Sequence, residues 1–276
     1  MAMTRTLNLA CALLLAACGC SAVSPKPKPE TDCSVLNRYD FSPINEFSGG
    51  DTNWFSFADS TPRATPDLTP PAITNLQLLN LPAPGRCGDT LGINLKASGH
   101  NFYGVGYGDY GLATNPKDGT GYEGISLWAR SDSVDAGGTD STFMLFVDDG
   151  STFVPPPDPA FKPGDLAPNG LCRIPPPQSP SVPTPACYGG GVLPPGTPPR
   201  IPDKDECGNQ FHTYVTVTET WQLILIPWSQ LAQWPCPNRK DGGIDVSDIS
   251  EIEIKFLQGT SYDVWIDNFE FYRLKH

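Results

Sequence analysis

Apolar and polar residues alternate along several short segments of the chain, and turn residues separate these segments. Because successive side chains of a β-strand point to opposite faces, such alternation predicts strands with one apolar face. No long helical period occurs outside residues 1–17. The pattern therefore predicts an all-β protein with a jelly-roll β-sandwich fold. The alternating segments are 91–97, 125–130, 142–147, 251–256 and 262–272.

One further segment, 221–226, is apolar on both faces. This composition is typical of a strand in the middle of a sheet, covered by other elements on both sides. Pro227 follows it and lacks the N–H that a sheet ladder needs, so the strand ends there. We therefore expect 221–226 to be a central strand.

The N-terminus has the layout of an export signal. Arg5 precedes a short apolar run, 7–17, that is too short to span a bilayer as a helix. The run ends in Leu-Ala-Ala followed by Cys18, which resembles the lipobox of bacterial lipoproteins. The alternative is an ordinary secretory signal that happens to contain a cysteine. The resemblance implies that residues 1–17 are a lipoprotein signal peptide and that Cys18 is lipidated. Gly19 in place of an aspartate favours the outer membrane or cell surface.

Two proline-rich segments divide the rest of the chain. Residues 18–32 contain alternating lysine and proline and predict an extended, lipidated tether. The remainder, 33–276, has the length of one sizeable β-domain. Within it, 155–202 holds 17 of the 31 prolines of the chain, so this stretch predicts a long loop insertion. A linker between two small domains is the alternative.

The charge of the chain limits its partners. The formal net charge is −12 and the isoelectric point is about 4.5. An acidic protein repels phosphate backbones and anionic lipid headgroups. We therefore expect no nucleic-acid partner and a contact with the lipid bilayer through the acyl anchor only.

The cysteines fit an exported domain. Once Cys11, Cys18 and Cys20 are assigned to the signal and tether, an even number remains, and none of them forms a close C-x-x-C pair typical of a metal site. Disulfides are expected in such a compartment, although six cysteines allow fifteen pairings. We expect cysteines that are neighbours along the chain to pair, because each bridge then closes a segment between strand regions: Cys33–Cys87, Cys172–Cys187 and Cys207–Cys236.

Catalytic motifs are scarce. The three histidines, His100, His212 and His276, are far apart in sequence and show no metal-ligand spacing. Asp148 and Asp149 are adjacent, and in a strand they would point to opposite faces, so the two carboxylates could not flank one glycosidic bond. The sequence therefore predicts a protein that is not an enzyme.

Aromatic residues are the richer signal, since tyrosine and tryptophan rings stack on sugar rings while nearby polar groups bind the hydroxyls. Core packing is the alternative for any one ring. Tyr107 and Tyr110 lie in a glycine-spaced segment that leaves little packing around them, which predicts exposure. Trp128 and Arg130 alternate with an apolar face. We expect Tyr107 and Tyr110 to stack on sugar rings, and Trp128 and Arg130 to line the same concave surface.

Several segments together are similar to jelly-roll carbohydrate-binding modules of the family 11 and galactose-binding-like type. They are 53–62 (NWFSFADSTP), 121–130 (GYEGISLWAR), 221–231 (WQLILIPWSQL), 246–254 (VSDISEIEI) and 262–271 (YDVWIDNFEF). The resemblance implies polysaccharide binding on a concave sheet face and, in many members, a structural Ca²⁺. It maps one calcium ligand to Asp267, and Asp40, in the first strand region, is a candidate second oxygen ligand. A turn or hydrogen-bonding role for Asp267 is the alternative. Asn268 departs from the family pattern, which has a second aspartate there.

These observations predict a non-catalytic, membrane-anchored lipoprotein that holds polysaccharide by aromatic stacking. The alternative is a structural or adhesion lipoprotein that uses the same sandwich for protein contacts.

Overall fold

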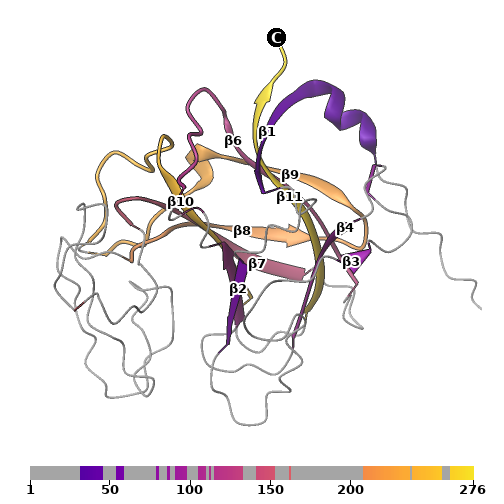
Figure 1. Ribbon diagram of the computed structural model, residues 1–276, viewed down its shortest axis with the longest axis horizontal. Helices are drawn as coiled ribbons and strands as arrows, with labels where there is room; N and C mark the ends of the chain where they lie inside the picture. The colour runs from indigo at the N-terminus through magenta and orange to yellow at the C-terminus, as the bar shows by residue number, and fades with distance from the viewer. Residues whose placement is uncertain are drawn as a thin grey trace, which may run out of the picture.

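The computed structural model describes residues 32–45, 54–58, 79–80, 86–87, 91–97, 105–109, 112, 115–132, 141–152, 162, 208–236, 238–256 and 262–276. Most of the described chain is strand, and the strands form two antiparallel sheets (Figure 1). Within these residues, no helix is long and apolar enough to cross a membrane. The all-β sandwich expected from the alternating pattern is confirmed.

The first sheet, called sheet I, has six strands in the order β3-β4-β11-β6-β9, and β1 pairs with the far half of β11. A short 3₁₀ helix, η1 (Cys33–Arg38), leads into it. A second, η3 (Trp228–Gln230), follows β9. The strands are β1 (Tyr39–Asn45), β3 (Leu79–Asn80), β4 (Leu91–Ala97), β6 (Gly124–Ser131), β9 (Gln222–Pro227) and β11 (Tyr262–Leu274).

The second sheet, called sheet II, has five strands in the order β2-β5-β10-β7-β8. They are β2 (Trp54–Ala58), β5 (Val105–Asp109), β7 (Ser141–Asp149), β8 (Phe211–Val217) and β10 (Ile249–Phe256). Each sheet has one face turned towards the core and one outer face. The outer faces of sheets I and II are called face I and face II below.

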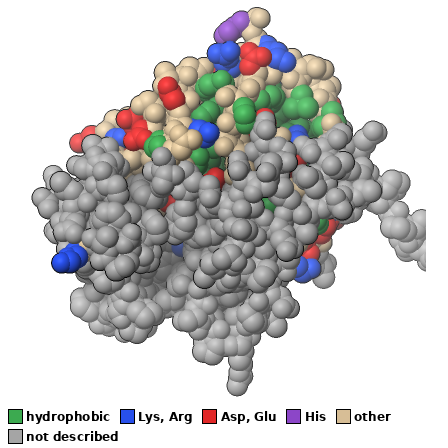
Figure 2. All heavy atoms as spheres, viewed as in Figure 1, with side chains coloured by type: hydrophobic (Ala, Val, Ile, Leu, Met, Phe, Trp, Pro, Cys, Tyr) green, Lys and Arg blue, Asp and Glu red, His purple; other side chains and the backbone are tan. Residues whose placement is uncertain are grey.

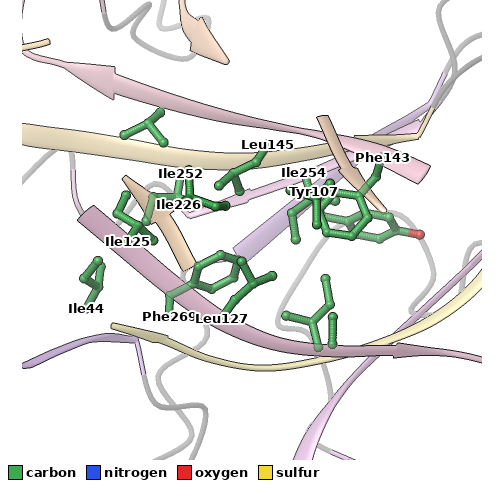
Figure 3. Close-up of a cluster of buried hydrophobic side chains, with 14 of the residues drawn as sticks. Ile44, Tyr107, Ile125, Leu127, Phe143, Leu145, Ile226, Ile252, Ile254 and Phe269 are labelled. Carbon is green, nitrogen blue, oxygen red and sulfur yellow. The ribbon is translucent and has the colours of Figure 1, made fainter. Parts of the chain in front are cut away.

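The core lies between the sheets and consists of the apolar halves of the alternating strands. Ile125 and Leu127 of β6 face Leu145 of β7 and Ile252 and Ile254 of β10 across this space (Figure 3). All five are at most 1% exposed. The alternation in the sequence therefore identified which side chains of these strands are inward.

Two strands, β9 and β10, lie at positions in their sheets that differ from those their residue patterns predict. β9 is apolar on both faces but forms an edge of sheet I, and most of its residues are only half-buried. The prediction of a central strand at 221–226 is therefore wrong. β10 alternates like a half-exposed strand but is central in sheet II, and every one of its residues is buried.

The backbones of β6 and β9 approach so closely at Gly124 that this position requires glycine. Gly124 begins β6 opposite Pro227 at the end of β9. A Cβ atom on Gly124 would lie 2.0 Å from the carbonyl oxygen of Ile226, so only glycine fits at this position.

One predicted disulfide is present, Cys33–Cys87, which ties η1 to the segment 86–87. Cys236 is also disulfide-bonded. The other cysteines of the predicted scheme, Cys172, Cys187 and Cys207, lie outside the described residues. So do the signal peptide, the tether up to residue 31 and, apart from Lys162, the proline-rich stretch 155–202.

The C-terminal end of β11 lies beside β1 (Figure 1). Around this end, the described surface mixes basic, acidic and apolar side chains (Figure 2).

Candidate functional site

The four residues predicted to bind sugar do not form one site. Tyr107 of β5 points into the core and is fully buried (Figure 3). Its ring packs edge-on against Phe256 at 6.3 Å, and its hydroxyl lies 3.5 Å from that of Tyr262. Burial raises the pKa of Tyr107 to about 12. The expectation that Tyr107 is exposed is wrong, and Tyr110 lies outside the described residues.

Trp128 and Arg130 lie on face I, with Ser126, as the alternation along β6 predicted. Their side chains are nevertheless buried, at 1% and 3% exposure. The Arg86 guanidinium lies 5.3 Å from the Trp128 ring centroid, and that of Arg130 lies 5.9 Å from Trp221. The Arg86 guanidinium therefore covers the Trp128 ring, which the sequence assigned to sugar binding.

The charges of face I occur in pairs. Asp267, fully buried, accepts a hydrogen bond of 2.6 Å from Nε of Arg86. Arg130 pairs with Asp132, whose other oxygen accepts from Trp265 at 3.0 Å. Each buried guanidinium on this face therefore has a carboxylate partner, which is the arrangement that a low-dielectric environment requires.

The predicted calcium pair does not fit the structure. Asp40 lies opposite Arg273 in the β1–β11 register and is paired with it at 3.5 Å. Asp267 is six residues earlier in β11, about 20 Å along the strand, and is bound to Arg86. The two carboxylates therefore cannot share one ion. Among the described residues, no group of three or more histidine, cysteine, aspartate and glutamate side chains is arranged to hold a metal.

Face II carries an aromatic group that we call the aromatic platform: His212 and Tyr214 of β8, with Trp234. The His212 and Trp234 rings stack at 4.0 Å, and Tyr214 lies edge-on to His212 at 6.4 Å. Tyr214 is 55% exposed, whereas Trp234 is half-buried. These rings share a face because residues 212 and 214 are two apart in one strand. Tyr214 is thus the exposed ring of the platform, whereas His212 is buried at 8% exposure and its backbone pairs with Ala232.

Polar groups flank the platform along β8. On one side, the hydroxyls of Thr142 and Thr216 lie 3.1 Å apart at an exposed position. On the other, Gln210 lies just before β8 and is half-buried. Polar groups on both sides of an exposed ring are what a hydroxyl-rich ligand requires.

Beside the platform, three carboxyl groups form what we call the carboxyl cluster: Asp148 of β7, and Glu251 and Glu253 of β10. Asp148 and Glu251 are opposite each other in the register. The side-chain amide of Gln210 donates to Asp148 at 2.7 Å and to Glu253 at 3.3 Å. The three residues are at most 9% exposed. Gln210 therefore connects the cluster to the strand that carries the platform.

Burial sets the protonation of the cluster. Desolvation raises the pKa of Asp148 to about 6 and that of Glu253 to about 7, the charge of Asp149 adding to the shift at Asp148. It also raises the pKa of Glu251 well above its usual range, and the charges of Asp148 and Glu253 add to this shift. Lys255, next on the same face of β10, favours ionisation of Glu253. Burial lowers the pKa of His212, so its ring is neutral near pH 7.

Asp149 points away from the cluster, as expected for a neighbour in a strand. It pairs with Lys240 at 2.7 Å and accepts the backbone N–H of Asp245 at 2.7 Å. It also accepts the backbone N–H of Ser151 at 2.9 Å. The sequence argument that Asp148 and Asp149 act on opposite faces is therefore right, and Asp149 has a structural role.

Sequence reasoning missed the main residues of face II. Tyr214 and His212 have one available signal, an alternation in 211–217 in which Phe211, Val215 and Val217 are inward. Glu251 and Glu253 lie on the polar side of the alternating segment 251–256, which is part of β10. Their contact with Asp148 joins residues about a hundred positions apart, and no local pattern reports such a contact.

No family model matches this sequence, and no curated protein matches it. Among solved structures, the chain is similar to the family 11 carbohydrate-binding module of the cellulosomal cellulase Lic26A-Cel5E of Clostridium thermocellum. The identity is 14%, the TM-score is 0.45, and the match covers 86% of this chain and 97% of that one.

Two further solved structures are comparably similar. One is a family 11 module of Clostridium thermocellum in complex with a β-1,3-1,4-mixed-linked tetrasaccharide, with 14% identity, a TM-score of 0.44, and coverage of 85% and 95%. The other is the family 30 module of the cellulosomal cellulase Cel9D-Cel44B of Clostridium thermocellum. Its sequence identity is 12% and its TM-score is 0.42, and the match covers 80% of this chain and 91% of that one. Family 11 modules, to which segments of the sequence are similar, are thus among the solved structures that resemble this chain.

Proposed function

We propose that this chain is a non-catalytic carbohydrate-binding lipoprotein that binds polysaccharide on face II. The observation that carries the proposal is the aromatic platform, with Tyr214 55% exposed on an edge strand. An exposed aromatic ring stacks on the apolar C–H face of a sugar ring. The sugar binds more tightly when polar groups beside the aromatic ring form hydrogen bonds with its hydroxyls. The exposed Thr142–Thr216 hydroxyl pair supplies such partners, and Gln210, whose amide binds Asp148 and Glu253, connects the platform to the carboxyl cluster.

The carboxyl cluster supports a binding role over a catalytic one. Glycosidases place two carboxyl groups on either side of the scissile bond, several ångströms apart. Here Asp148 and Glu251 are opposite each other in adjacent strands, and the side-chain amide of Gln210 donates to both Asp148 and Glu253. All three carboxyl groups are at most 9% exposed, so they cannot flank the glycosidic bond of a polysaccharide, and we assign them to shaping the binding face.

We propose that this binding face lies outside the cell, at the outer membrane or cell surface, because residues 1–17 have the layout of an export signal that ends at Cys18. Lipid on Cys18 holds the chain, and the tether separates the sandwich from the bilayer. Replacing Cys18 by serine, Cys18→Ser, should abolish palmitate labelling and release the protein from the membrane fraction. A Cys18→Ser protein that still labels and pellets with membranes would contradict the anchor.

The binding proposal is tested by affinity electrophoresis of the full chain, solubilised in mild detergent, through gels containing single polysaccharides. Mixed-linked β-1,3-1,4-glucan is the first probe, because a solved structure with a similar fold binds a tetrasaccharide of that linkage. Retardation by at least one polysaccharide, without release of reducing ends, is the expected result. If none retards the chain, the structural or adhesion role becomes the better account.

A further inference from the structure

The carboxyl cluster has a feature that sugar binding alone does not require. Its three acids are buried side by side on face II, with Asp148 opposite Glu251 and Glu253 two residues along the same strand. Opposite residues of an antiparallel pair have Cβ atoms about 5 Å apart. Three carboxylates at such distances, out of contact with water, repel one another strongly.

Few groups are present to offset that repulsion. Lys255 of β10 is the cation on this face among the described residues, and it is 7% exposed. Asp109 of β5 adds a further negative charge that acts on Glu251. From β8, His212 contributes a neutral ring near pH 7. One oxygen of Asp148, Oδ1, is buried and has no hydrogen-bond partner. The repulsion among the three carboxyl groups is therefore relieved only while some of them are protonated.

We propose that the carboxyl cluster is a proton-dependent lock on the glycan-binding face, which holds face II together when protonated and loosens it, releasing glycan, as pH rises. The inference rests on the proposed function for its glycan step and on the geometry of the cluster for its lock. The link between the two is Gln210, which lies just before the platform strand β8 and whose amide binds Asp148 and Glu253.

The sign of the effect follows from the protonation states. In the unfolded chain, aspartate and glutamate ionise near pH 4. In the folded protein the pKa values of Asp148 and Glu253 are raised to about 6 and 7, and that of Glu251 is raised further. The folded state therefore binds more protons than the unfolded state above pH 4, and stability falls as pH rises through 5 to 8. Most acidic proteins with paired carboxylates show the opposite slope in their acid range.

The test uses the full chain in detergent and two readouts, the melting temperature and gel retention by the polysaccharide that retards it. Between pH 5 and pH 8, the melting temperature should fall by on the order of 5 °C and retention should weaken several-fold. Glu251→Gln is close in shape to the protonated acid, so this variant should lose most of both pH dependences. Glu219→Gln, which removes an exposed carboxylate, should keep them.

Asp148→Asn is the second variant and should flatten the same profiles, which guards against a folding defect of Glu251→Gln. A melting temperature that is flat or rises between pH 5 and pH 8 would overturn the lock. If the melting temperature falls between pH 5 and pH 8 but gel retention does not change, the proposed effect of the lock on glycan binding would be overturned. Absence of retention at every pH would contradict the proposed function, and the melting profile would still decide the lock.

Discussion

The two outer faces of the sandwich bury charge in different ways. On face I, the buried Asp267 has Arg86 at 2.6 Å, and the buried Arg130 has Asp132. On face II, three buried carboxyl groups share Lys255 and one glutamine amide. On face I the buried charges are therefore stabilised by opposite charges, whereas on face II the buried acids are stabilised by staying protonated.

The faces also differ in their aromatic residues. On face I the Trp128 ring is 1% exposed and lies beneath Arg86, which is next to the bridged Cys87. On face II, Tyr214 is 55% exposed on an edge strand. A closed, paired face is typical of a structural role, whereas an open aromatic face beside polar groups is typical of a binding site.

The largest expected effect concerns the tyrosine that the sequence assigned to sugar. Tyr107→Ala removes a fully buried ring that packs on Phe256. We expect it to lower the free energy of unfolding by about 4 kcal/mol, measured by urea denaturation. Tyr214→Ala is the matched change on face II and should cost less than about 0.5 kcal/mol. Equal losses from the two variants would mean that Tyr214 is a core residue too.

The next effect compares one chemical change, acid to amide, on the two faces. Asp267→Asn removes the carboxylate that pairs with the buried Arg86 and should destabilise the protein by about 3 kcal/mol at pH 8. Glu251→Gln at the same pH removes a carboxyl group that is repelled by its neighbours, so it should be neutral or stabilising. Urea denaturation of both variants at pH 8 checks this contrast. A large loss from Glu251→Gln would show that face II is also held by paired charge.

The smallest effect concerns the exposed carboxylate of the predicted calcium pair. Asp40 and Arg273 are both about half exposed. Asp40→Asn should therefore change the free energy of unfolding by no more than about 1 kcal/mol. Addition of Ca²⁺ should not raise the melting temperature of the wild-type chain through this residue. A calcium-dependent rise that Asp40→Asn abolishes would restore Asp40 as a ligand.

Residue patterns located the strands well, because period-two alternation reports which side chains share a face. They placed β6, β7, β10 and β11 and identified the inward rows of each. They did not report which strands are neighbours. An apolar β9 therefore suggested the middle of a sheet, although it is an edge, and a charged β10 suggested partial exposure, although it is central.

The candidate site was harder to predict, because its parts come from distant positions. The glycines beside Tyr107 suggested an exposed ring, but its packing comes from Phe256 and Tyr262, far along the chain. Gly106 and Gly108 instead lie opposite Lys255 and Glu253 on face II. Local spacing therefore described the backbone of β5 correctly and the surroundings of its tyrosine wrongly.

The central claim is that glycan binds face II, and the most direct measurement compares one tyrosine with one tryptophan. Tyr214 is exposed on face II, whereas Trp265 is half-buried on face I, where it donates to Asp132. Dissociation constants for the retained polysaccharide should rise about fivefold in Tyr214→Ala, since a stacked ring contributes about 1 kcal/mol. Trp265→Ala should bind like the wild type. Wild-type affinity in Tyr214→Ala together with a loss in Trp265→Ala would contradict the account and move the site to face I.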